Sequence, residues 1–118
     1  MLLTNAEKFS SIASLYGNAY RSADLEEAWR NVLFNQFHDI LPGSGIRENY
    51  IDAGEKFKAS ETIGTFELNN ALACLSRQIR TSMAKHGTPL LVFNPLSWER
   101  SDIASARLPE GTADEYAV

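Results

Sequence analysis

The longest uninterrupted helical pattern in this chain is Ser44–Met83, SGIRENYIDAGEKFKASETIGTFELNNALACLSRQIRTSM. Apolar or small residues recur in it every three or four positions, and no proline lies between Pro42 and Pro89. They are Ile46, Tyr50, Ala53, Phe57, Gly64, Leu68, Leu72, Leu75, Ile79 and Met83. This spacing predicts one helix of roughly 55 Å at about 1.5 Å per residue, capped by its first serine. Gly54 and Gly64 each cost about 1 kcal/mol relative to alanine, so a kink is allowed at either position.

A shorter helix is predicted at the start of the chain. Thr4 and Glu7 have the spacing of a capping box, and Gly17-Asn18 is a plausible stop. The apolar positions between them are Phe9, Ile12, Ala13, Leu15 and Tyr16.

A second short helix is expected to start after Ser22, where Asp24 complements the positive end of the helix dipole. Its apolar face consists of Leu25, Ala28, Trp29, Val32 and Leu33. Pro42-Gly43 should end the regular hydrogen bonding, because proline has no N–H and glycine tolerates unusual dihedral angles. We therefore expect a mainly α fold, a three-helix bundle over residues 1–88, in which the long helix is packed by the first two.

The pattern changes after Pro89. Leu90–Phe93 is a short apolar run typical of a buried strand, residues 94–97 indicate a turn, and Ser101–Leu108 is a second, weaker strand. Two strands alone are marginally stable in water. Residues 89–118 are therefore expected to form the first β-hairpin of a β domain that is incomplete in this chain.

Composition limits the class of protein. The 118 residues carry a formal net charge of -4 and are 44% hydrophobic, which fits a soluble globular segment and argues against disorder and membrane insertion. No basic stripe with interleaved aromatics is present, so nucleic acid is not an expected partner. Cys74 is the only cysteine, which excludes an internal disulfide, and it lies in an apolar helical stretch as a small core residue.

His38-Asp39, just before Pro42-Gly43, is the pair with the clearest chemical potential. Neutral imidazole is a good zinc ligand, and both side chains can face one site only where the helix is ending. For the bare pair alone, a purely structural explanation is favoured, since the dipole at a helix C-terminus stabilises histidine, and aspartate can bond a backbone N–H. Only His38, His86 and Cys74 are available besides carboxylates, so we expect no complete zinc site in this chain.

The longer string Gln36-Phe37-His38-Asp39-Ile40-Leu41-Pro42-Gly43-Ser44 resembles the middle-domain signature of class II α-mannosidases, glycoside hydrolase family 38. The resemblance extends upstream through Leu25–Trp29 and Leu33, and downstream through Val92–Trp98. It implies a helical middle domain followed by the opening strands of a β-sandwich domain, incomplete over residues 89–118.

The resemblance also implies roles for two residues. In that family a preceding (β/α) catalytic domain supplies a histidine and two aspartates to one zinc ion, together with the nucleophile and the acid/base. By motif position, His38 is the remaining zinc ligand and Asp39 hydrogen-bonds sugar hydroxyls. Many members have a second histidine where this chain has Phe37, a departure that indicates a bacterial or cytosolic-type branch and hence a cytoplasmic parent.

The expected function is therefore that of a segment, inactive alone, of a retaining enzyme that removes terminal α-linked mannose from oligosaccharides. Its expected partners are the sugar and the catalytic barrel of the same parent chain. A same-family mannosylglycerate hydrolase is an alternative, as is a helical interaction module without a catalytic role. Asp24, Glu48 and Asp52 are interpreted as solvated surface charges rather than catalytic groups.

Overall fold

The computed structural model describes residues 1–81 and 88–106. The chain divides into two compact units, Met1–Gln78 and Ile79–Val118. The described residues contain three α-helices, all in the first unit: α1 (Leu2–Ser14), α2 (Ser22–Asn35) and α3 (Arg47–Ser76). The predicted domain boundary, between a helical domain over residues 1–88 and a β domain from residue 89, stays a prediction, because it lies next to the undescribed residues 82–87. None of the described helices is long and apolar enough to cross a bilayer.

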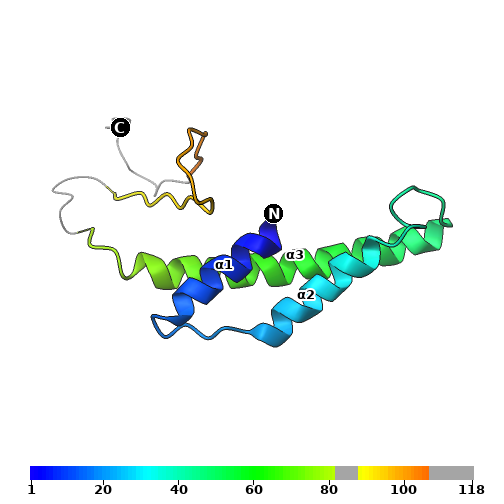
Figure 1. Ribbon diagram of the computed structural model, residues 1–118, viewed down its shortest axis with the longest axis horizontal. Helices are drawn as coiled ribbons and strands as arrows, with labels where there is room; N and C mark the ends of the chain where they lie inside the picture. Colours follow the sequence, from blue (N-terminus) through cyan, green and yellow to red (C-terminus); the bar gives the residue numbers. More distant parts are fainter. Residues whose placement is uncertain (82–87, 107–118) are drawn as a thin grey trace. The chain divides into compact units, whose positions relative to one another are not determined.

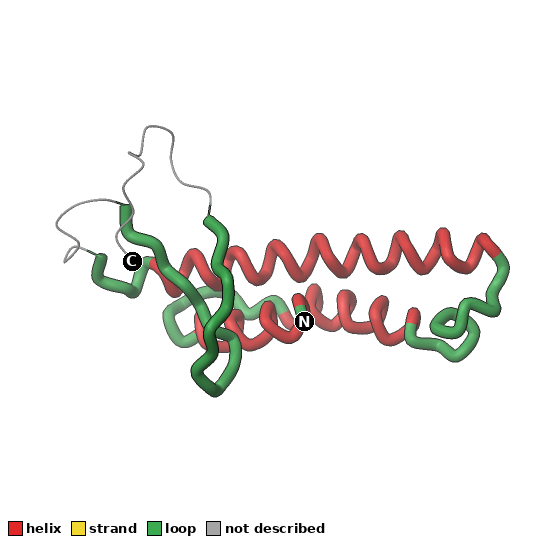
Figure 2. Tube along the Cα trace, turned by 90° about the horizontal axis from the view of Figure 1, so that it is seen from above, coloured by secondary structure: helices red, strands yellow, loops and turns green. Residues whose placement is uncertain are grey.

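In the first unit both short helices pack along α3 and make few contacts with each other (Figure 1). Gly64 of α3 lies against Leu2 and Leu3, and Cys74 lies against Ala13, so α1 runs parallel to α3. Helix α2 runs the opposite way, because its last residue contacts the N-terminal part of α3. The three helices lie side by side in both views (Figure 2). The predicted arrangement, a long helix packed by two short ones, is confirmed.

The packing surface of α3 is made of small residues. Its buried positions alternate by three and four, or by seven, which is the spacing of a coiled-coil seam. They are Ala53, Ser60, Gly64, Glu67, Ala71 and Cys74. On α1 the buried residues are Leu3, Ala6, Ser10 and Ala13. The three-to-four spacing was predicted, but of the positions predicted for the stripe of α3 only Ala53 and Gly64 are among the buried residues. Many large apolar residues predicted to pack in the three helical segments are exposed, among them Ile12, Leu15, Tyr16, Leu33 and Phe57.

Several helix boundaries differ from the predictions. Helix α2 ends at Asn35, seven residues before the predicted stop at Pro42-Gly43. Helix α1 already begins at Leu2 with Met1 as N-cap, so Thr4 lies within the helix and the predicted capping box is wrong. Helix α3 is capped by the extended Ile46, not by Ser44, and it ends at Ser76. At 30 residues it is about 45 Å long and is one continuous helix through both glycines. Met83 lies outside the described residues.

Polar groups buried between the helices make specific contacts. The Ser60 hydroxyl donates hydrogen bonds to the carbonyls of Ala28 at 3.0 Å and Lys56 at 2.9 Å, which links α3 to α2. The Glu67 side chain is 1% exposed, and Arg21 Nη1 lies 3.8 Å from its Oε1. Burial raises the pKa of Glu67; the positive charge of Arg21 opposes this rise and the negative charge of Asp24 adds to it.

In the second unit, residues 88–106 contain no strand, so the predicted hairpin is not formed there. Residues 107 and 108 of the second predicted strand lie outside the described part. The predicted turn is present: Leu96 N–H donates to Asn94 Oδ1 at 3.1 Å, and Asn94 Nδ2 donates to the Trp98 carbonyl at 2.7 Å. A short isolated strand pair buries too little surface to be stable, which accounts for a turn without a ladder.

Candidate functional site

The predicted site lies in the loop of residues 36–46, which connects α2 to α3 (Figure 1). The loop is built from tight turns. Ile40 N–H and Leu41 N–H both donate to the Phe37 carbonyl, at 3.0 and 3.1 Å, and Gly43 N–H donates to the Ile40 carbonyl at 3.3 Å. Gly43 has φ of 79°, a left-handed conformation that strains any side chain. Pro42-Gly43 thus lies in a chain reversal, but α2 has already ended at Asn35, so the helix stop predicted at Pro42-Gly43 is wrong.

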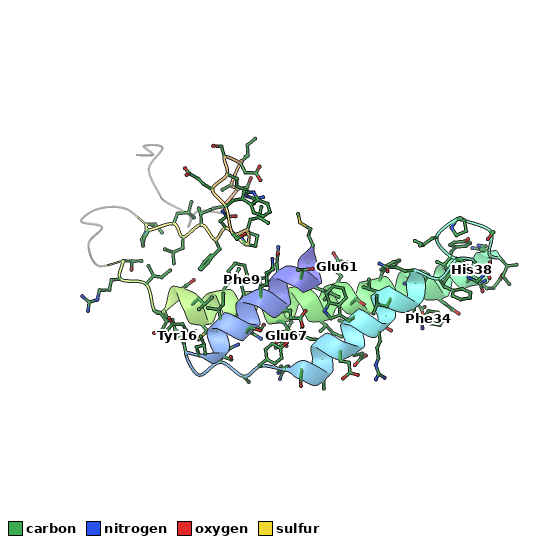
Figure 3. The ribbon with its side chains drawn as sticks, in the orientation of Figure 1. Phe9, Tyr16, Phe34, His38, Glu61 and Glu67 are labelled. Carbon is green, nitrogen blue, oxygen red and sulfur yellow. The ribbon has the colours of Figure 1, made fainter. Side chains whose placement is uncertain are left out.

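His38 projects from this loop (Figure 3), and both it and Asp39 are exposed to solvent. Their side chains are 77% and 59% exposed, and His38 Nε2 lies 3.6 Å from Asp39 Oδ2. This separation is longer than a hydrogen bond, so the two side chains do not satisfy each other's hydrogen-bonding capacity. The imidazole leans on the Phe37 ring, with centroids 4.1 Å apart and planes tilted by 44°. The loop after α2 therefore places an imidazole and a carboxylate next to each other, and both remain accessible to a ligand.

The backbone of Asp39 is fixed by two hydroxyl groups. Ser44 Oγ and Tyr50 Oη each donate to the Asp39 carbonyl at 3.4 Å. Tyr50 Oη in turn accepts a hydrogen bond from Gly45 N–H at 2.9 Å. The apolar spacing predicted Tyr50 as a packing residue and did not indicate this role. The signal available was its position in the first turn of the helix that follows the loop.

The pair alone offers too few ligands to hold a metal ion. Among residues 1–81 and 88–106, no group of three or more His, Cys, Asp or Glu side chains could hold a metal ion. Cys74 is buried between α1 and α3, in the core position predicted for it. His86 lies outside the described residues. Any metal bound at His38 would therefore need most of its ligands from beyond the described part of this chain.

The other residues singled out in the sequence belong to the surface or to helix packing. Glu48 and Asp52 are exposed, and Asp24 pairs with Arg21 at 3.2 Å, as expected of solvated charges. Trp29 Nε1 donates to Glu7 Oε2 at 3.2 Å, which ties α2 to α1. The Tyr20 hydroxyl donates to Glu7 Oε1 at 3.4 Å, and burial together with the Glu7 charge raises the pKa of Tyr20.

Several exposed apolar side chains lie close in sequence to the His38-Asp39 turn. They come from the end of α2, from the loop and from the start of α3, and we name them the apolar rim. Its members are Leu33, Phe34, Phe37, Leu41, Ile46 and Ile51. Phe34 also carries Lys56 Nζ over its ring, 5.3 Å from the centroid.

Comparison with known proteins assigns the helical unit. Residues 1–75 match the family model described as the alpha mannosidase middle domain. The chain therefore belongs to the alpha-mannosidase middle-domain family, as its resemblance to class II α-mannosidases predicted. No solved structure matches it.

The relatives are much longer proteins. Over 116 residues the chain is 31% identical to "Alpha-mannosidase 2C1" of Mus musculus and 30% identical to that of Homo sapiens. Over 93 residues it is 27% identical to "Alpha-mannosidase" of Saccharomyces cerevisiae, which is 77% of this chain and 8% of that protein. The two mammalian matches cover 93% of this chain but 10% of each relative, so the chain spans about a tenth of their length.

Proposed function

We propose that this chain is the segment of a retaining, zinc-dependent α-mannosidase that supplies one metal ligand, His38, and one sugar-binding carboxylate, Asp39. The observation that carries the proposal is the pairing of these two exposed groups on a tightly turned loop of an alpha-mannosidase middle domain. The substrate would be terminal α-linked mannose of oligosaccharides. The chain alone would be inactive.

The donor set fits a shared zinc ion. A neutral imidazole is a preferred zinc ligand, and the His38 side chain is 77% exposed, with its Nε2 3.6 Å from Asp39 Oδ2. Catalytic zinc sites usually take three protein ligands, and this loop offers one histidine. The remaining ligands would come from the preceding catalytic barrel of the same parent chain. When bound, zinc would supply a template for sugar hydroxyls and stabilise developing charge.

The chain's own residues would then bind and orient rather than break bonds. Asp39, next to His38, would accept hydrogen bonds from sugar hydroxyls and so select the orientation of the ring. Retention requires a nucleophilic carboxylate and an acid/base carboxyl about 5–5.5 Å apart, on either side of the scissile bond. We assign neither role to this chain, because Asp24 is paired and Glu48 and Asp52 are ordinary exposed carboxylates.

The apolar rim supports the shared-site proposal. When another surface covers exposed phenylalanine, leucine and isoleucine side chains, their apolar area is removed from water, which is favourable. Covering the rim with the catalytic barrel would exclude water around His38 and Asp39. In the same way, the extended residues 88–106 would gain strand partners from the rest of a β-sandwich domain.

The test is His38→Ala in the whole protein, with Gln36→Ala as a matched control on the same exposed loop. His38→Ala is expected to lower the zinc content several-fold and turnover of p-nitrophenyl α-mannoside by at least tenfold, with unchanged helical circular dichroism. Gln36→Ala should retain both zinc and turnover. Full zinc content and activity in His38→Ala would refute the proposal and favour a purely structural helical module.

A substrate comparison separates the two enzymatic alternatives. The wild-type whole protein is assayed with p-nitrophenyl α-mannoside and with mannosylglycerate. Preference for the first supports the α-mannosidase assignment, whereas turnover of mannosylglycerate alone would replace it with the same-family hydrolase.

A further inference from the structure

Tyr50 joins the two ends of the turn that presents His38 and Asp39. It lies in the first turn of α3, and its hydroxyl reaches back over the loop. There Oη accepts the hydrogen bond from Gly45 N–H at 2.9 Å and donates to the Asp39 carbonyl at 3.4 Å. The first distance is that of a well-formed N–H···O bond, and the second is longer. One phenol therefore links α3 to both sides of the Pro42-Gly43 reversal.

The close approach at this point depends on Gly45. A Cβ on Gly45 would meet Asn49 Nδ2 at 3.0 Å and the Asp39 carbonyl oxygen at 3.4 Å. The absence of a side chain lets the Gly45 backbone pass near Asp39 and present its N–H to the phenol. The Ser44 hydroxyl, 3.4 Å from the same carbonyl, is a second and longer contact to it.

The Asp39 carbonyl is the group through which Tyr50 contacts the turn. It belongs to the peptide that follows Asp39, so its orientation is tied to the ψ angle of that residue and to the direction of its side chain. His38 directly precedes Asp39, so one turn carries both side chains. Loops without a hydrogen-bond ladder sample peptide rotations readily, unless a side chain from a rigid element holds them.

We infer that Tyr50 is a positioning residue, which holds the His38-Asp39 turn in the conformation that presents both side chains. Its consequence for metal binding rests on the proposed function. Partners that orient metal ligands without touching the metal typically change metal affinity by about 10–100-fold when removed. Tyr50 acts through the backbone rather than on the imidazole, so we expect an effect near the lower end of that range.

The experiment uses the whole protein with Tyr50→Phe, which removes only the hydroxyl and keeps the ring. The matched control is Tyr20→Phe, which removes a hydroxyl that donates to Glu7 elsewhere in the same unit. In zinc-free protein, amide hydrogen exchange of residues 39–46 should accelerate by up to about tenfold in Tyr50→Phe, because one hydrogen bond that resists local opening is lost. In zinc-loaded protein, zinc release to a chelator should accelerate by a similar factor.

Steady-state kinetics should also change in Tyr50→Phe and not in Tyr20→Phe. Tyr50→Phe is expected to raise KM for p-nitrophenyl α-mannoside more than it lowers the turnover of enzyme that still holds zinc, because Asp39 loses its orientation. Tyr20→Phe should match wild type in loop exchange, zinc release and KM.

The outcomes distinguish this inference from the proposed function. If His38→Ala loses zinc but Tyr50→Phe keeps wild-type loop exchange and zinc release, the role of Tyr50 is overturned and the proposed function stands. Faster loop exchange without faster zinc release also overturns the positioning role. Retention of zinc in His38→Ala refutes the proposed function, and with it any effect of Tyr50 on the metal.

Discussion

Asn35 and Ala53 close the base of the loop that carries His38. Asn35 is the last residue of α2 and is 1% exposed; its Nδ2 donates a hydrogen bond of 2.8 Å to the Ala53 carbonyl in α3. The two residues are 18 positions apart in sequence, with the whole loop between them. This contact therefore fixes where the loop leaves one helix and where it meets the other.

Removing the amide should destabilise the helical unit. Asn35→Ala deletes a buried hydrogen bond and leaves space at the seam, for an expected loss of about 1–3 kcal/mol in the free energy of unfolding. The measurement is urea unfolding followed by helical circular dichroism. Asn70→Ala, at an exposed position of α3, serves as the control and should be neutral or slightly stabilising. Equal midpoints for the two variants would contradict the importance of the Asn35 contact.

Gly64 should resist substitution because α1 lies directly on it. A Cβ at this position would lie 2.8 Å from Leu3 Cδ2 and 3.1 Å from Leu2 Cγ. Overpacking of this kind costs about 1–3 kcal/mol, against a gain in helix propensity of up to about 1 kcal/mol. Gly64→Ala should therefore be destabilising or at best neutral in thermal unfolding.

The same helix offers the control. A Cβ on Gly54 would meet nothing within 4 Å, so Gly54→Ala should gain about 0.4–1 kcal/mol. The prediction fails if Gly64→Ala unfolds at the same temperature as Gly54→Ala or higher.

Glu67 should make stability depend on pH. Its burial raises its pKa above the ordinary value near 4.5, so the folded chain binds a proton more tightly than the unfolded chain. Stability is therefore lost as pH rises from about 4.5 through the raised pKa, and the loss persists at neutral pH. Glu67→Gln should remove this dependence and stabilise the chain at pH 7 by about 1 kcal/mol.

Comparison of pH 7 with pH 4 isolates the effect. At pH 4 the two chains should have nearly equal urea midpoints, because the carboxyl is then neutral in both states. Glu61→Gln, on the exposed side of α3, should change little at either pH (Figure 3). A Glu67→Gln variant that is less stable than wild type at pH 7 would mean that the charge pair with Arg21 outweighs the burial of the carboxylate.

The parts of the fold that depend on local sequence, such as turns and helical spacing, could be predicted. Proline and glycine at 42 and 43 restrict backbone dihedrals whatever surrounds them, so a chain reversal there could be predicted from the sequence. The end of α2 could not, because the helix stops at Asn35, seven residues before Pro42. The three-to-four spacing of α3 was also visible. Its seam was harder to assign, because helices that approach closely bury alanine, serine and glycine and leave larger side chains such as Phe57 at the edges.

Features that depend on tertiary contacts could not be predicted from local sequence. Thr4 and Glu7 have the spacing of a capping box, but Glu7 instead accepts hydrogen bonds from Trp29 and Tyr20 of later segments. The spacing of Tyr50 predicted a packing role, and the contact of its hydroxyl with the loop depends on how the loop folds back toward α3. The predicted strands after Pro89 need neighbours that residues 88–106 do not supply.

The only cysteine of the chain supplies a built-in reporter of helix opening. Cys74 is 4% exposed, and its Sγ lies 3.9 Å from the carbonyl oxygens of Ala13 and Tyr16, beneath the last turn of α1. A thiol-modifying reagent can reach that sulfur only during moments when α1 lifts away from α3. The rate of alkylation in native buffer would thus count those excursions directly, with no label added to the protein.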